Sequence, residues 1–220
     1  MQREATATKL VYNSPIHKET AMRMLSFVLT SLCILLTISS VLAKDMKRQK
    51  PMDPLAMMEL WKQAAMPGEP HKLFATLAGS WTTTTKEWVE PGKPPMESTG
   101  TAESKMLLDG RFLHQEFHGQ MMGQPFTGMS IDAYDNLRKK YVTIWVDTRG
   151  TGVFIMEGTG SADGKTITLG GSHAEPGGGQ MSHRAIWKII DANNQLVEMY
   201  STHHDQKERK MMEITYTRKE

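Results

Sequence analysis

Cysteine is almost absent from this chain of 220 residues, since Cys33 is the only one. It lies inside an apolar run near the N-terminus that we expect to be removed. Without it the chain has no disulfide, no thiolate nucleophile and no cysteine-ligated metal site. A domain of about 150 residues buries enough surface to fold without disulfides, so their absence does not argue against a stable domain.

An excess of charge of either sign is also missing. Four of the 26 basic and two of the 24 acidic residues precede position 44, which leaves 22 of each and a net charge of zero with histidine neutral. Nucleic-acid binding by counterion release requires a basic surface. The basic stretch KDMKRQK at 44–50 is short and is interpreted as a solvated tail. We therefore predict no nucleic-acid partner.

The apolar run at residues 27–42, FVLTSLCILLTISSVL, is shorter than the ~20 residues that span a bilayer. Lys18 and Arg23 precede it, and small residues up to Ala43 close it. A charged start, a short apolar core and a small-residue end are typical of a secretory signal peptide. We predict cleavage after Ala43, export to the periplasm or the exterior, and no stable membrane insertion of the mature chain.

Two other interpretations of this N-terminal segment stay open. The run can be retained as a membrane anchor, or it can be a lipoprotein signal that uses Cys33. Leu32 before that cysteine, and the apolar residues after it, disfavour lipidation. The 21 residues before Met22 do not resemble an export leader, so Met22 or Met24 is a candidate for the true start.

Long connections between the predicted strands are missing as well. From Ser80 onward, short runs rich in Thr, Val, Ile and aromatic residues alternate with turns rich in Gly, Asp and Asn. Such turns pair neighbouring strands as antiparallel hairpins, and none has room for the helix of a parallel crossover. Barrel and sandwich both fit, and the short connections favour an all-β, antiparallel, up-and-down, calycin-like β-barrel. The predicted strands lie near 80–90, 97–107, 111–118, 125–134, 139–147, 152–159, 165–171, 181–190, 195–203 and 209–218.

Two short helices are predicted ahead of the strands. Asp53 and Pro54 suit the start of the first helix. The second spans 69–78 and directs Phe74 and Leu77 inward. The predicted organisation is a signal peptide at 1–43 with a possibly misassigned upstream start, a tether with an N-terminal helix at 44–66, and a β-barrel domain at 67–220.

Several stretches of the sequence resemble one bacterial family, the domain of unknown function 1579. They are PGEPHKLFATLAGSW, PGKPP, DGRFLHQEF, YDNLRKKYVTIWVDTRGTG, GKTITLGG, EMY and MEITYTRK. The resemblance covers about residues 67–219, and its most specific part is the YDN to WVD stretch. It implies an exported β-rich domain and assigns no activity.

A second resemblance, to the calycin barrels that include the lipocalins, depends on Gly79-Ser80-Trp81 directly after a helix and on Arg218 near the end of the last strand. In calycins a basic residue of the last strand packs on the tryptophan of the first. The resemblance implies structural roles for Gly79, Trp81 and Arg218.

The most polar predicted strand carries His114, Glu116 and His118. Alternate residues of a strand share one face, so these three side chains line up together. Two imidazoles and a carboxylate can bind zinc, copper or iron, which makes this strand a candidate metal site. Same-face neighbours are ~7 Å apart, so a plain solvated strand face is the alternative.

A second group of charged residues interrupts otherwise apolar strands. Arg184 and Glu198 lie on consecutive strands, and we predict an inward-facing ion pair between them that forms the polar part of a ligand pocket. A purely structural pair or outward-facing charges are the alternatives. The predicted ligand-binding residues are Arg184, Glu198, Glu213, Trp145, Asp147 and Tyr200.

Nucleophilic catalysis has little support, because the sequence contains no G-x-S-x-G motif and no mature cysteine. His173 and His183 flank the loop EPGGGQ, which is interpreted as flexible rather than phosphate-binding. Three functions follow from the residues: an exported barrel that binds a small, partly apolar molecule, a metal-binding protein or enzyme that uses His114, Glu116 and His118, or a structural envelope protein with a filled barrel. The aromatics expected to line or buttress a pocket are Trp81, Trp145, Trp187, Tyr141 and Tyr200.

Overall fold

The computed structural model describes residues 52–203 and 206–220. The predicted signal peptide and the basic tail at 44–50 lie outside the described residues. Residues Leu55–Glu220 form one compact unit.

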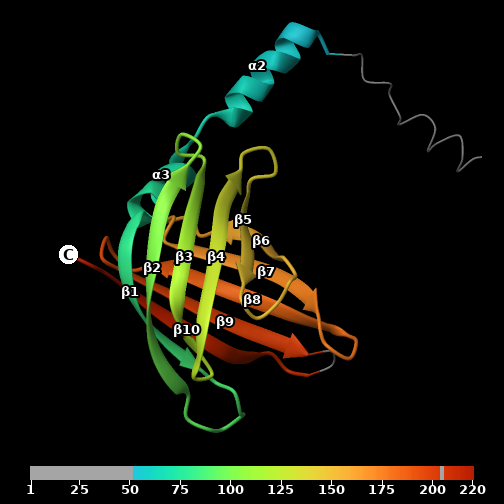
Figure 1. The fold of residues 1–220 in the computed structure, drawn as a ribbon. Coiled ribbons are helices and arrows are strands. Elements are labelled where there is room, and N and C mark those ends of the chain that lie inside the picture. Colours follow the sequence, from blue (N-terminus) through green and yellow to red (C-terminus); the bar gives the residue numbers. More distant parts are fainter. Residues whose placement is uncertain (1–51, 204–205) are drawn as a thin grey trace, which may run out of the picture. The chain divides into compact units, whose positions relative to one another are not determined.

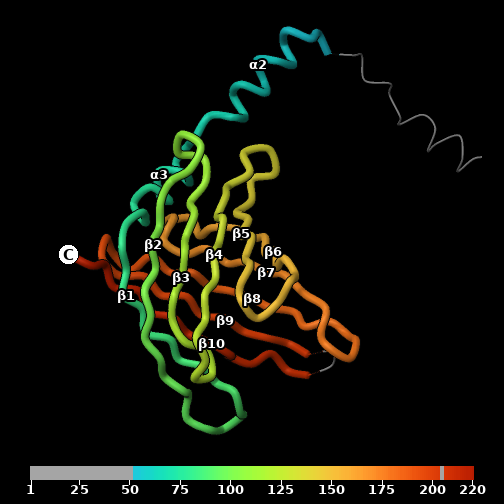
Figure 2. Tube along the Cα trace, in the orientation of Figure 1, coloured from blue at the N-terminus to red at the C-terminus, as the bar shows by residue number. Residues whose placement is uncertain are grey.

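Ten antiparallel strands form a closed barrel in which each strand pairs with the next along the chain, and β1 closes the ring against β10 (Figure 1). This confirms the predicted up-and-down barrel and excludes the sandwich. Figure 2 shows the same meander as a continuous trace, with β2 to β5 forming one wall and the strands from β7 onward another. The strands are β1 Gly79–Glu87, β2 Met96–Leu107, β3 Phe112–Met121, β4 Gln124–Asp135, β5 Lys140–Asp147, β6 Phe154–Gly160, β7 Thr166–Ala174, β8 Gln180–Ile189, β9 Asn194–His203 and β10 Arg209–Arg218.

Tight turns produce this order. The β3–β4 hairpin turns on Met122 and Gly123, which both adopt positive φ (50° and 73°). Two central residues with positive φ match the right-handed twist of the flanking strands. Inward and outward side chains then alternate along each strand, so that Trp81, Thr83 and Thr85 of β1 are buried while the residues between them are exposed.

Helices precede the barrel as predicted. α2 spans Pro54–Ala65 and buries none of its residues, whereas α3 spans Glu69–Leu77 and buries Phe74 and Leu77 in a core with Leu113. Asn136 of the β4–β5 turn donates hydrogen bonds to the carbonyl of Ala64, in the last turn of α2, and to that of Met66, just after the helix. Within residues 52–203 and 206–220, no helix has both the length and the apolar character needed to cross a bilayer.

The junction of α3 and β1 confirms the predicted calycin-like contact. Trp81 is fully buried, its Nε1 donates to the Leu77 carbonyl (3.1 Å), and the Arg218 guanidinium carbon lies 4.1 Å from its ring centroid. Arg218 also donates to the carbonyls of Thr76 (2.6 Å) and Ala78 (2.8 Å). Gly79 has φ of 129°, and a Cβ there would lie 2.4 Å from Arg218 Nη1. These contacts hold α3, β1 and β10 together at one end of the barrel.

Candidate functional site

The interior of the barrel contains a cavity of about 820 Å³. Its lining comes from the inward-facing residues of β1 and of β3 to β10, and from the loops after β5 and β7. Phe74 and Leu77 of α3 pack against Leu113 and Trp187 at the other end of the barrel, which closes that end. The cavity is therefore a cup whose floor lies toward α3 and whose rim is formed by the β5–β6 and β7–β8 loops.

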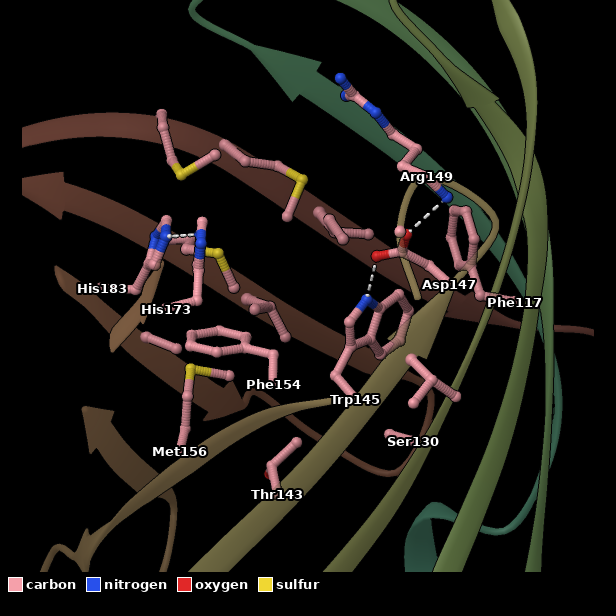
Figure 3. Close-up of a pocket in the computed structure, with 18 of the residues that line it drawn as sticks. Phe117, Ser130, Thr143, Trp145, Asp147, Arg149, Phe154, Met156, His173 and His183 are labelled. Carbon is pink, nitrogen blue, oxygen red and sulfur yellow. Dashed lines mark hydrogen bonds between the residues drawn. The ribbon is translucent and has the colours of Figure 1, made fainter. Parts of the chain in front are cut away.

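Aromatic rings make up one wall of the cup. Phe126 lies 5.9 Å from Phe117 and is stacked on Trp145, with a centroid distance of 6.3 Å. Gly128 on the neighbouring strand makes room for the indole, because a Cβ there would lie 2.3 Å from Trp145 Cζ2. Trp145 Nε1 donates to Asp147 Oδ2 (2.7 Å), and Asp147 Oδ1 accepts from the backbone N–H of Arg149 (2.8 Å) (Figure 3). These bonds fix the indole against the wall.

A pair of histidines lies on the wall that Figure 3 shows opposite Trp145. The Nε2 atoms of His173 and His183 are 3.0 Å apart, and the edge of Phe154 contacts both rings. His173 Nδ1 donates to the Ala174 carbonyl (2.9 Å), so His173 Nε2 is the acceptor between the rings. His183 therefore donates through Nε2, and its buried Nδ1 has no hydrogen-bond partner among the residues that the structure describes. Burial, and to a lesser extent the neighbouring imidazoles of His173 and His203, lowers the pKa of His183 to about 4, which keeps this ring neutral at pH 7.

A buried carboxyl group lies nearer the floor. Asp132 is 5% exposed, and it accepts hydrogen bonds from the hydroxyls of Ser130 (2.8 Å) and Thr143 (2.6 Å). Burial raises the pKa of Asp132 to about 6, against the opposing effect of the two hydroxyls. Tyr216 donates to Gln115 beside it (3.3 Å), and burial raises the pKa of this tyrosine as well. The cup is thus apolar on its walls and polar at a few fixed points.

Comparison with known proteins places this barrel in a family. A family model described as "Protein of unknown function (DUF1579)" matches residues 66–218. The chain belongs to the DUF1579 family. No curated protein matches it.

Two solved structures resemble this DUF1579 protein. The crystal structure of Rv2717c from M. tuberculosis has 15% sequence identity and a TM-score of 0.52, and the match covers 70% of this chain and all of that one. A redesigned β-barrel, b11L5F_LGL, has 12% identity and a TM-score of 0.37 over 67% of this chain and 95% of its own. At these identities only the fold is shared, and only the first match supports it.

Of the six residues predicted to bind a ligand, Trp145 and Asp147 line the cavity of this DUF1579 barrel. The other four lie on its outer face, so the prediction of an inward Arg184–Glu198 pair is wrong. The inward residues of β8 are His183, Ala185 and Trp187, one position out of phase with Arg184. The four outward residues are Arg184, Glu198, Tyr200 and Glu213.

The outward charges have other partners. Arg184 forms a two-bond pair with Glu208 (2.9 and 2.6 Å) and lies 4.2 Å above the ring of Tyr200. Glu198 accepts from Lys188 and Lys210 (2.7 Å each), and these bonds lower its pKa to about 2. Lys210 also binds Glu213. Adjacent strands therefore carry these charges on the outer surface, where no apolar ligand would be enclosed.

The predicted metal site does not assemble. His114, Glu116 and His118 share the outer face of β3 as predicted, but His114 Nε2 lies 3.9 Å from Glu116 Oε1, and His118 instead pairs with Thr127 Oγ1 (3.2 Å). In the part of the chain that the structure describes, no three His, Cys, Asp or Glu side chains are arranged to hold a metal ion. These residues form a polar outer strand face.

Sequence reasoning missed the polar residues of the cup. Ser130 and Asp132 continue the inward phase that Phe126 and Gly128 begin on β4, so the period-two pattern of that strand contained the signal. The histidine pair could not be found in this way, because His173 and His183 lie on separate strands and meet only through the β7–β8 register.

Proposed function

We propose that this DUF1579 domain is exported and binds a small, largely apolar molecule inside its barrel. The observation that carries the proposal is the cavity of about 820 Å³ lined by aromatic and methionine side chains. Small-molecule sites have volumes of about 300–1,000 Å³, mostly apolar walls and a few fixed polar groups. The volume argues against the alternative of a filled, purely structural barrel.

The walls favour a ligand with a rigid or aromatic body. Phe117, Phe126 and Trp145 present flat faces, and methionines line much of the remaining wall. Methionine is flexible and polarizable, so it adapts to ligands of irregular shape. The polar groups of Asp132 and His183 would orient such a ligand, since an unmade hydrogen bond to a buried polar group costs ~1–3 kcal/mol.

Titration with a neutral apolar dye tests the proposal. N-phenyl-1-naphthylamine should bind with 1:1 stoichiometry and quench the fluorescence of Trp145 as it fills the cup. Met199 lines the cavity on β9, and Met199→Trp should fill part of the space and weaken binding by about tenfold or more, equivalent to ~1.4 kcal/mol.

A matched variant controls for the added indole. Leu196 lies on the outer face of the same strand, and Leu196→Trp should leave dye binding unchanged. Equal dye affinity in all three proteins would place the dye outside the barrel and would contradict the proposed function.

A further inference from the structure

We propose that the molecule held in the cup carries a protonated amine, which pairs with the carboxylate of Asp132 at the deep end of the cavity. This inference rests on the proposed function, because it concerns the chemistry of the same ligand. It follows from the position of Asp132, from its partners, and from the distribution of charge between floor and rim.

Asp132 lies toward the closed end of the barrel. In the strand register it is opposite Leu113 on one side and Thr143 on the other. Leu113 is fully buried and packs in the core that includes Phe74 of α3. A ligand group that reaches Asp132 is therefore surrounded by protein, with the rest of the ligand extending toward the rim.

The Asp132 carboxylate has no counter-ion among the residues that the structure describes. Its hydrogen-bond partners there are the hydroxyls of Ser130 and Thr143, and no basic side chain affects its titration. Two hydroxyl donors occupy one lone pair on each oxygen, which leaves further acceptor capacity. A buried charge without a partner is costly, so an incoming cation that pairs with it gains binding energy.

The acidic side chains at the rim have partners within the protein. Asp147 accepts from Trp145 and from the backbone of Arg149, and the Arg149 guanidinium is directed at the sulfur of Met121 (2.9 Å). Glu175 of the β7–β8 loop likewise pairs with His203 Nδ1 (3.1 Å), whereas the partners of Asp132 at the floor are hydroxyls alone among the described residues. The field inside the cup therefore favours a ligand whose positive end points inward, and it disfavours a buried carboxylate.

Aromatic rings support the same choice of ligand. Trp145 lies opposite Ser130 in the register, one inward position from Asp132. Its partner Phe126 extends this aromatic wall toward the rim. Aromatic faces attract ammonium groups within about 6 Å, most strongly where water is excluded. A carboxylate at the floor beside an indole is thus suited to an amine attached to an apolar body.

Three naphthalenes of similar size provide the test: 1-naphthylmethylamine, 1-naphthylmethanol and 1-naphthoate, titrated at pH 8 by fluorescence. We expect the amine to bind at least about tenfold tighter than the alcohol, as for a hydrogen bond to a charged group, and the carboxylate to bind most weakly. Asp132→Asn should bring the affinity ratio of amine to alcohol close to one while leaving the alcohol's own affinity unchanged.

A charge-matched control is Asp109→Asn, because the Asp109 side chain is exposed in the β2–β3 turn and does not line the cavity, so this variant should keep the full preference. Thermal melts of both variants check that the barrel is folded. Equal affinity of amine and alcohol in the unmodified protein, or a preference that survives Asp132→Asn, would overturn this inference alone. Failure of all three compounds to bind would overturn it together with the proposed function.

Discussion

At the scale of single residues, burial decides what each charged side chain contributes. Asp132 and Glu198 are both carboxylic acids on strands, yet the pKa of one is raised to about 6 and that of the other lowered to about 2. Desolvation dominates inside the cup, whereas two lysine ammonium groups dominate on the outer face. The same functional group thus penalises folding at one site and supports it at the other.

Replacing Asp132 by asparagine should stabilise the empty barrel at pH 8. Because the pKa of Asp132 rises from 3.8 to about 6 on folding, the folded state holds its proton more tightly, and stability is lost as the pH rises from about 4 to about 6. A shift of roughly two units corresponds to about 3 kcal/mol. Urea unfolding should show Asp132→Asn more stable by up to that amount at pH 8 and equal near pH 4. A variant less stable than the parent at pH 8 would contradict this assignment.

Replacing Arg184 by leucine should cost little, because the Arg184–Glu208 pair is exposed. The two side chains are 36% and 40% exposed, and surface pairs contribute ~0–1 kcal/mol. Urea unfolding should therefore give a loss below about 1 kcal/mol. A loss of ~3–5 kcal/mol is the result expected of a broken buried pair and would reinstate an inward Arg184.

At the scale of elements, glycines set how closely strands approach. Gly158 of β6 faces β7 so closely that an added Cβ would lie 1.8 Å from the Thr168 carbonyl oxygen. At Gly170 of the same hairpin, the nearest atom would be 3.8 Å away. Neither glycine has a positive φ, so the two positions differ only in the room available for an added Cβ.

Gly158→Ala should therefore destabilise the barrel by ~2 kcal/mol or more, since the clash is with backbone that has to move. Gly170→Ala should change stability by no more than ~0.5 kcal/mol, as is usual for open surface positions. Chemical denaturation of the two variants side by side checks this. Equal effects would show that β6 and β7 do not approach as closely as described.

The order and the approximate bounds of the strands were predictable from the sequence. Turn residues and β-branched runs located all ten strands within a few residues, because short hairpins leave a meandering chain few alternatives. The inward face was predictable where one face is plainly polar, as in β7, in which buried Ile167 and Leu169 alternate with Thr166 and Thr168. It was not predictable in β8 and β9, because Ile186 and Leu196 are apolar residues on the outer face, and beside Ile186 the pattern places Arg184 in a core strand.

At the scale of the whole molecule, the pocket itself had no sequence signature. A cavity is the space left between side chains from nine strands, and the same residue types can fill a barrel or leave it hollow. Trp145 and Asp147 were identified because they share one strand. The carboxyl of Asp132 and the histidine pair acquire their character only from what the closed barrel places around them.

Export of the protein, with removal of residues 1–43, is a prediction about the whole molecule. If residues 1–43 are a signal peptide, N-terminal sequencing of the protein from the exported fraction should begin at Lys44. Replacing Ala43 by a bulky residue such as Trp should block that processing and leave a longer, membrane-associated chain. Recovery of the full-length chain from the cytoplasm in both cases would contradict the prediction.

Native mass spectrometry of the freshly purified mature protein tests the central claim most directly, that the barrel is a hollow cup holding one small molecule. We predict a single species heavier than the polypeptide by one small-molecule mass, which is lost on denaturation. The extra mass should be missing from Met199→Trp and retained by Leu196→Trp. A polypeptide mass alone in the parent protein, or an added mass that is unaffected by filling the cup, would contradict the account.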